Sequence, residues 1–245
     1  MSRASALDAR LLSTPVVLAE LHARAEPARL GGMARVGIRT ERALGVSMPE
    51  LRALAKRIGV DHRVASELWA TGIHEARILA SMIEDPGAVT EREMDLWAGD
   101  FDSWDVCDQV CGNLFVRTPF AYAKALVWSE REPEFVKRAA FSLMACLAVH
   151  DRAARDVDLA SFLPVIEREA TDDRNAVKKG VNWALRQIGK RSPGLNRRAI
   201  AAGRRLRVSG SRSARWIGSD AVRELTSEPV QRRLAAALPR PSRRA

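Results

Sequence analysis

A tryptophan and an acid stand four residues apart in the middle of the chain, at Trp104 and Asp108. Asp102 and Ser103 just before them are good N-cap residues, and an apolar run follows, so the sequence predicts a helix that begins here. Residues four apart share one face of a helix. An indole plane beside a carboxylate suits a site that binds a flat cation or helps one to form. The alternative is a core tryptophan beside a solvated acid, which these residues alone do not exclude.

Two later segments combine basic and aromatic side chains. Lys137 and Arg138 stand in the first turn of a predicted apolar helix, where cations are unfavourable next to the positive end of the helix dipole. We therefore expect these side chains either to bind a partner or to pair with a carboxylate held in a fixed position. Trp183 shares a predicted helix face with Lys179 and Arg186. Basic groups around tryptophans suit a groove that contacts nucleic-acid phosphates and bases. For each helix, a solvated basic side chain on an ordinary amphipathic helix is the alternative.

Composition restricts the class of protein. The chain has 245 residues, of which 47% are hydrophobic and 29% are charged, as in ordinary soluble globular proteins. It contains neither an apolar run of about 20 residues, which a membrane span would need, nor an apolar segment of signal-peptide type. Three cysteines, an odd number, argue against a disulfide framework. These features predict a cytoplasmic protein without a membrane span.

The positive charge belongs to the last quarter of the chain. The formal net charge is +10, and the segment from Lys190 to Ala245 has 15 basic and 3 acidic residues. A polyanion is the expected partner, with nucleic acid favoured over an anionic membrane because no basic helix with a bulky apolar face stands out. The alternative is a solvated basic tail.

Helical periodicity with frequent breaks runs through almost the whole chain. Helices are predicted over residues 11–25, 48–58, 62–70, 74–83, 94–101, 103–116, 120–129, 134–149, 156–170, 173–190, 193–206, 214–225 and 228–238, with a flexible joint at Gly31 and Gly32. Short turns between helices of this length indicate antiparallel pairs. We therefore predict an all-α fold, a right-handed superhelical stack of antiparallel helix pairs of the HEAT-like α-solenoid kind. It forms a single domain over residues 1–238, and residues 239–245 are a frayed basic tail.

Metal and cofactor sites are not indicated by the sequence. Cys107 and Cys111 are four apart, but no matching Cys or His pair stands near them, so buried thiols are favoured over a zinc site. His62, His74 and His150 are scattered along the chain. The glycine-rich cofactor motifs, the P-loop and the nucleophile elbow are all missing. The prediction is that the protein uses no metal and no cofactor.

Three stretches together resemble the DNA alkylation repair glycosylases of the AlkD type. They are SWDVCD at residues 103–108, FVKRAAF at 135–141 and VKKGVNWALR at 177–186, in the family's order and spacing. The stretches LGVSMPEL and TGIHEARIL, at residues 44–51 and 71–79, are also similar, and the likeness covers about residues 36–225. The resemblance implies a HEAT-like superhelix that binds duplex DNA and excises N3- or N7-alkylated purines without metal or cofactor.

The resemblance also implies roles for particular residues. Trp104 and Trp183 flank the damaged nucleotide, and Asp108 is the catalytic carboxylate. By the same resemblance, Arg138 holds a backbone phosphate. Lys179 and Arg186 are expected to contact DNA as well, because they share the predicted helix face of Trp183. Alkylation makes the purine a cationic leaving group, and its departure gives the sugar oxocarbenium character, which a nearby carboxylate stabilises while it orients the attacking water. The expected substrate is duplex DNA containing alkylated bases, and the protein is expected to act as a monomer.

Two other hypotheses remain open. Active family members often carry paired tryptophans where this chain has Ser103 followed by Trp104, and some relatives bind DNA but excise poorly. A non-catalytic HEAT-like module that binds nucleic acid or an acidic protein is therefore the main rival, and the basic last quarter of the chain fits it equally well. In the third hypothesis Trp104 and Trp183 are ordinary core residues.

Overall fold

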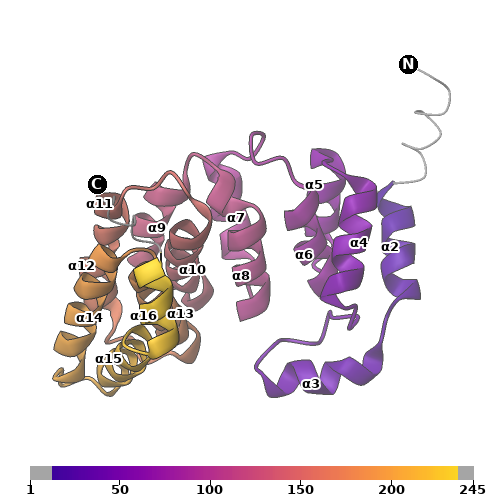
Figure 1. The fold of residues 1–245 in the computed structure, drawn as a ribbon. Coiled ribbons are helices and arrows are strands. Elements are labelled where there is room, and N and C mark those ends of the chain that lie inside the picture. The colour runs from indigo at the N-terminus through magenta and orange to yellow at the C-terminus, as the bar shows by residue number, and fades with distance from the viewer. Residues whose placement is uncertain (1–12, 237–245) are drawn as a thin grey trace. The chain divides into compact units, whose positions relative to one another are not determined.

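The computed structural model describes residues 13–236, and this part of the chain contains helices and no strands (Figure 1). The all-α, HEAT-like prediction is confirmed. The chain forms two compact units, Met1–Pro119 and Phe120–Ala245. The basic tail predicted at residues 239–245 lies outside the described residues, and the single domain over residues 1–238 stays a prediction. None of the described helices is both long and apolar enough to cross a membrane.

The first unit is built on a layer formed by α4, α6 and α8, with α5 packed against α6 and α2 against α5. Its helices are α2 (Thr14–Ala23), η1 (Pro27–Arg29), α3 (Leu30–Arg35), α4 (Met48–Ile58), α5 (His62–Ala70), α6 (His74–Ile83), α7 (Glu91–Gly99), α8 (Trp104–Asn113) and η2 (Phe115–Arg117). Trp69 and Trp97 stack with their ring centroids 4.0 Å apart and join α5 to α7. Phe101 and Phe115 extend this aromatic core.

The second unit contains three packed helix pairs, α9 with α10, α12 with α13, and α14 with α15. Its helices are α9 (Ala121–Ser129), α10 (Glu134–His150), α11 (Asp156–Ala160), α12 (Phe162–Glu169), α13 (Asn175–Gly189), α14 (Pro193–Arg207), α15 (Arg212–Leu225) and α16 (Glu228–Ala236). Because α13 contacts both α10 and α15, these three helices form one layer. Gly203 and Gly218 let α14 and α15 approach closely, since a Cβ at Gly218 would lie against the Gly203 carbonyl.

Local sequence explains the starts of α4, α5 and α7 in the first unit. Ser47 with Glu50, and Thr90 with Glu93, form capping boxes at the starts of α4 and α7. Asp61 caps α5, since its carboxylate accepts a backbone amide of the first turn at 2.9 Å. These bonds satisfy backbone donors that a helix start would otherwise leave without a partner.

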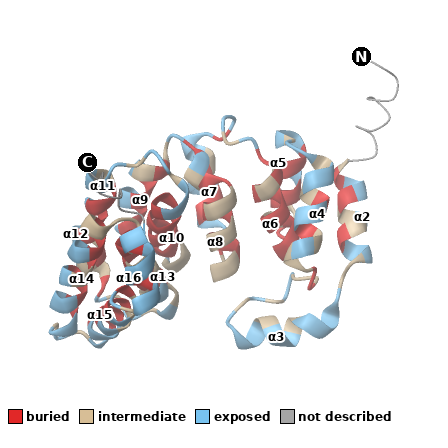
Figure 2. Cartoon of the chain, in the orientation of Figure 1, coloured by how far each residue is buried: buried red, intermediate tan, exposed pale blue. Residues whose placement is uncertain are grey.

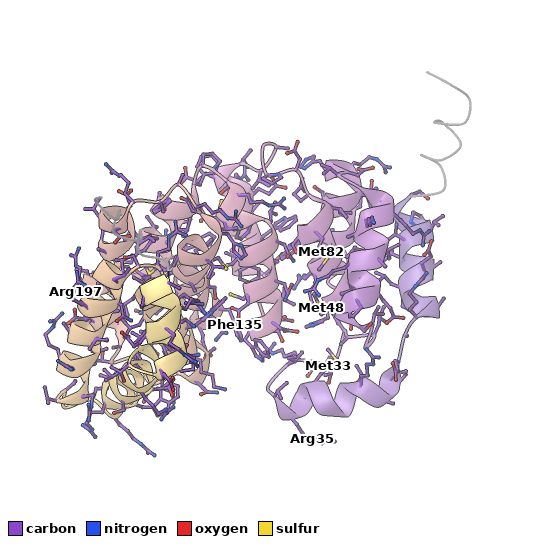
Figure 3. The ribbon with its side chains drawn as sticks, viewed as in Figure 1. Met33, Arg35, Met48, Met82, Phe135 and Arg197 are labelled. Carbon is purple, nitrogen blue, oxygen red and sulfur yellow. The ribbon has the colours of Figure 1, made fainter. Side chains whose placement is uncertain are left out.

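The core of each unit lies between its own helices. Buried residues occupy the faces where helices meet, and exposed residues occupy the outer faces (Figure 2). The three cysteines are buried and form no disulfide. Met82, in the last turn of α6, is only half-buried and belongs to the surface of the first unit (Figure 3).

Several local predictions are wrong, and two of them concern where the helices break. The flexible joint expected at Gly31 and Gly32 lies inside α3, a short helix without buried residues that continues from η1, where Pro27 has a backbone angle suited to a first helical turn. The helix expected over residues 156–170 is broken between α11 and α12. Pro164 has no N–H to donate to the Ala160 carbonyl. The Ser161 hydroxyl donates to a different carbonyl, that of Asp158, at 2.6 Å.

Candidate active site

The first turn of α8 carries the predicted tryptophan and carboxylate. Trp104 is the first residue of α8 and Asp108 lies one turn further along, and both are partly exposed. The buried face of this helix is made by Val106, Cys107, Val110 and Cys111. Three other tryptophans of the chain, Trp69, Trp97 and Trp128, are at most 5% exposed. Trp104 therefore belongs to the surface of its unit and not to the core.

A segment without helix or strand, residues 36–46, holds the start of α8 and is called the strap below. The Trp104 indole N–H donates to the Val36 carbonyl at 3.0 Å. The Arg39 amide donates to the hydroxyl of the fully buried Ser103 at 3.0 Å. Ser103 is the N-cap residue by position, but the predicted capping bond from its side chain is wrong, because its hydroxyl accepts from the strap instead. The strap thus holds the side chains of Ser103 and Trp104 at the start of the candidate site.

Glu75 anchors the other end of the strap to α6. This carboxylate is 1% exposed and accepts the amides of Leu44 at 2.8 Å and Gly45 at 2.7 Å. Gly45 has φ +79°, and a Cβ there would lie against the Glu26 carbonyl, so the close approach requires glycine. The two family-like stretches at residues 44–51 and 71–79 therefore meet in the structure, at a contact that neither stretch reveals alone.

His74 joins α6 to α8 through Asp105, whose carboxylate lies 2.9 Å from Nε2 of the imidazole. Both side chains are largely buried, at 5% and 16% exposure. Burial alone would favour neutral imidazole, but the hydrogen bond to Asp105 and its negative charge outweigh burial and raise the pKa of His74 above its ordinary value of 6.5. The pair therefore favours the imidazolium in the folded protein.

This ion pair predicts a pH dependence of stability. Because the pKa of His74 is raised by folding, its contribution to the free energy of unfolding is complete below pH 6.5 and is lost as the pH rises through the folded-state pKa. His74→Gln should remove this contribution, which urea unfolding of both proteins from about pH 5.5 to about pH 9 would measure. The pKa of His62 is also raised, by Glu84, so only the difference between the two proteins reports on His74. A difference that stays constant across this range would contradict the prediction.

The predicted residues of the second unit lie on α10 and α13. Arg138 is 6% exposed and donates from Nη1 to the Ala176 carbonyl in the first turn of α13, at 2.6 Å. Its neighbour Lys137 pairs with Glu169 at 2.9 Å. Lys137 therefore pairs with a carboxylate of the protein, which is one of the two roles expected for this basic pair. The hydrogen bond of Arg138 links α10 to α13.

On α13 the three predicted residues differ in their surroundings. Trp183 is partly exposed and Lys179 is exposed. Arg186 lies between two carboxylates of α15, with Nε 2.5 Å from Glu224 and Nη1 3.3 Å from Asp220. To contact a phosphate, Arg186 would have to exchange these ion pairs. Trp104 and Asp108 belong to the first unit, and Arg138 and the three residues of α13 belong to the second.

A group that could hold a metal ion lies elsewhere in the first unit. His62, Glu84 and Glu93 each offer one ligand atom, and these atoms lie within 4.8 Å of one another. Internal contacts already use these side chains, since His62 pairs with Glu84 at 2.8 Å and Glu93 belongs to the capping box of α7. None of the three is a residue of α8.

The surface position of Trp104 leads to a stability prediction. Trp104→Ala should lower the free energy of unfolding much less than Trp128→Ala, because Trp128 is 2% exposed and loss of a buried tryptophan costs about 3–5 kcal/mol. Thermal melts of both variants measure this. Equal losses would mean that Trp104 acts as a core residue.

The fold of this chain is similar to that of a solved structure built from HEAT-like repeats. That structure belongs to "a new family of proteins related to the HEAT-like repeat DNA glycosylases with affinity for branched DNA structures". The TM-score is 0.73 at 20% sequence identity, and the match covers 86% of this chain and 95% of the other. The fold is therefore that of the HEAT-like repeat proteins. The family model of the DNA alkylation repair enzymes matches residues 17–225, so this chain belongs to the DNA alkylation repair enzyme family. None of the curated proteins matches this chain.

Proposed function

We propose that this protein is a cytoplasmic DNA glycosylase that releases positively charged N3- or N7-alkylated purines from duplex DNA by hydrolysis of the N-glycosidic bond. Membership of the DNA alkylation repair enzyme family supports the class of substrate. The observation that carries the proposal is the position of Trp104 and Asp108, one turn apart and partly exposed at the start of a helix that the strap holds in place. A carboxylate that must act on a bound nucleotide needs this combination of access and fixed position.

In the proposed reaction the substrate supplies much of the driving force. The alkylated purine is already cationic, so it can leave without protonation, and the C1′–N bond breaks toward an oxocarbenium-like sugar. Asp108 stabilises that charge and orients the water that attacks C1′. The Trp104 and Trp183 indoles attract the cationic base, by about 1 kcal/mol or more when water is excluded. Lys179 contacts the DNA backbone directly, and Arg138 and Arg186 contact it by exchanging their internal contacts for phosphates. No cofactor takes part.

The test is base release from a defined substrate. A duplex oligonucleotide with one N7-methylguanine is incubated with an excess of the protein, so that each protein molecule acts at most once. The amounts of free base and of abasic sites are followed over time, and their rate of formation is compared with the rate of spontaneous release. We expect release that is faster than the spontaneous rate and that stops at one base per duplex. The same duplex without the methyl group is the control. Absence of release with both N7-methylguanine and N3-methyladenine substrates would overturn the enzyme hypothesis.

The second candidate function is DNA binding without excision. It is favoured by the solved structure at 20% identity, which is described as having affinity for branched DNA structures, and by the single tryptophan beside Ser103. Competition between a four-way junction and a linear duplex for the wild-type protein distinguishes the two functions. Salt-dependent binding that prefers the junction, without base release, would support this candidate.

A further inference from the structure

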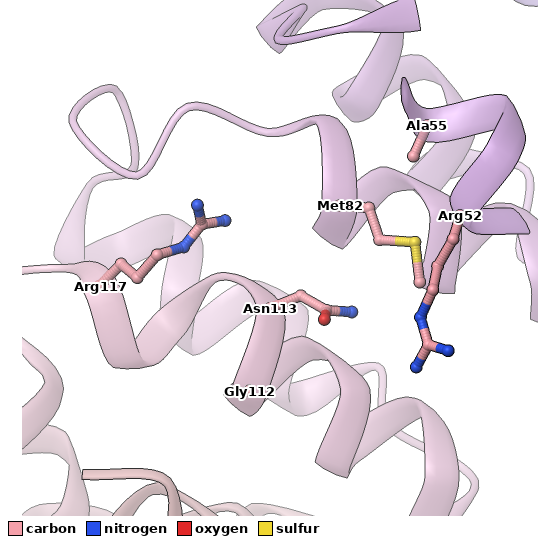
Figure 4. Close-up of a pocket in the computed structure, with 6 residues that line it drawn as sticks. All are labelled: Arg52, Ala55, Met82, Gly112, Asn113 and Arg117. Carbon is pink, nitrogen blue, oxygen red and sulfur yellow. The ribbon is translucent and has the colours of Figure 1, made fainter. Parts of the chain in front are cut away.

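A hollow of about 360 Å³ lies on the first unit, beside the C-terminal ends of α6 and α8 (Figure 4). It is lined by Arg52, Ala55, Met82, Gly112, Asn113 and Arg117. These residues come from α4, α6, α8 and η2, so four separate elements form it. Arg52 and Arg117 lie on opposite sides of Asn113, and Met82 and Ala55 add an apolar surface next to Arg52.

The charge of this hollow is not balanced by its own lining. No acidic side chain lines it, and both arginines are exposed. Neither guanidinium has an ion pair with any residue of the described range 13–236. Other arginines of the same unit do have one, for example Arg57 with Glu20 at 2.8 Å and Arg63 with Glu67 at 2.9 Å. Two unpaired guanidiniums at a concave surface attract an anion with more than one charged group.

Asn113 gives the hollow a fixed polar group. Its Nδ2 donates to the hydroxyl of the fully buried Ser81 at 3.1 Å and to the Gln109 side chain at 3.3 Å. These two bonds hold the amide in one orientation between the arginines. Polar groups held in this way orient a ligand without a further loss of side-chain entropy.

The hollow is adjacent to the candidate carboxylate along α8. Gly112 follows Asp108 by four residues, which places it on the same helix face, about 6 Å further along the axis. Duplex DNA rises about 3.4 Å per nucleotide of one strand, so this distance corresponds to about two nucleotides. A strand with its reacting nucleotide at Asp108 would therefore bring nearby phosphates to the hollow.

We propose that this hollow binds the phosphodiester backbone of DNA, with Arg52 and Arg117 each contacting a phosphate and the apolar surface of Met82 and Ala55 facing a deoxyribose. The inference rests on the proposed action on DNA. It adds a contact of the first unit to the predicted contacts Arg138, Lys179 and Arg186, all of which belong to the second unit. Its role is to hold the strand in place next to Asp108, independently of the chemistry at that carboxylate.

The salt dependence of DNA affinity tests this site. We expect Arg52→Gln and Arg117→Gln each to reduce the slope of log affinity against log salt by about 1, and the double variant to reduce it by about 2, for undamaged duplex measured by fluorescence anisotropy. Arg63→Gln is the matched control, because Arg63 is also exposed but is paired with Glu67, and it should leave the slope unchanged. A variant with both Arg52→Lys and Arg117→Lys should retain the wild-type salt slope, since lysine keeps the positive charge at each position.

The outcomes separate this site from the proposed enzyme activity. A reduced slope in a protein that releases no base would support the hollow and overturn the glycosylase proposal. If the variant with both Arg52→Gln and Arg117→Gln releases base normally and keeps the wild-type salt slope, only the proposal that the hollow binds the DNA backbone is overturned. A wild-type protein that does not bind DNA at low salt would overturn both, and equal slope changes in Arg63→Gln would show a general charge effect instead of a site.

Discussion

Asp108→Asn is expected to lower the rate of base release by about 10²–10³-fold, the usual effect of removing one group that stabilises transition-state charge. Asparagine has nearly the same shape as aspartate, so the start of α8 and its contacts with the strap should stay intact. What is lost is the negative charge next to the oxocarbenium-like sugar. Single-turnover release from N7-methylguanine duplex, corrected for spontaneous depurination, measures this rate.

The same substitution should not weaken DNA binding. A carboxylate repels the phosphates of a polyanion, so removing its charge is expected to leave affinity unchanged or to increase it. The rate and the affinity are therefore expected to change in different directions, which a simple loss of folding would not produce. Asp173→Asn is the control, because Asp173 is an exposed carboxylate of the second unit that has no proposed role in the reaction. Equal release by Asp108→Asn and wild type would exclude Asp108 as the catalytic carboxylate.

Glu75→Ala is expected to destabilise the first unit strongly. The variant removes the acceptor from the amides of Leu44, which is half-buried, and Gly45, which is buried. Hydrogen bonds to a charged acceptor contribute about 1.5–3 kcal/mol each, so the free energy of unfolding should fall by about 3 kcal/mol or more. For a chain of this length that corresponds to a decrease in melting temperature of roughly 6–12 °C, which a thermal melt measures.

The matched control for Glu75 lies in the strap itself. Glu41→Ala removes an exposed carboxylate from the same segment and should change the melting temperature little. Glu75→Gln keeps one carbonyl oxygen as an acceptor and should lie between wild type and Glu75→Ala. If both Glu75 variants have the melting temperature of the wild type, the strap is not held by this carboxylate.

Local sequence is sufficient to predict much of the fold. The bounds of α5 and α6 agree with the predicted ranges 62–70 and 74–83, because N-caps, breaks and apolar spacing act within a few residues of the helix ends. The capping boxes of α4 and α7 are predictable for the same local reason. The break at Ser161 is not, because apolar residues continue at helical spacing on both sides of it and predict one long helix in spite of Pro164.

The surroundings of the site could not be predicted in this way. The acceptor of the Trp104 indole is 68 residues away in the sequence, and Glu75 reaches amides 30 and 31 residues away. His74 and Asp105 are likewise 31 residues apart, so nothing in their own segments indicates the pair. Charge counts also do not show whether a basic side chain is already in an ion pair, as Arg186 is with two carboxylates of α15. Composition and spacing identify candidate residues, but only packing shows which of them have access to a ligand.

The strap also makes the site observable without a substrate. Its segment has no helix or strand, and amides in such segments ordinarily exchange with solvent deuterium within a short time. The amides of Arg39, Leu44 and Gly45 are bonded to side chains of Ser103 and Glu75, so they should exchange only when the strap opens. Their protection factors would therefore report the free energy of opening at the start of α8, separately from the unfolding of the helices around it.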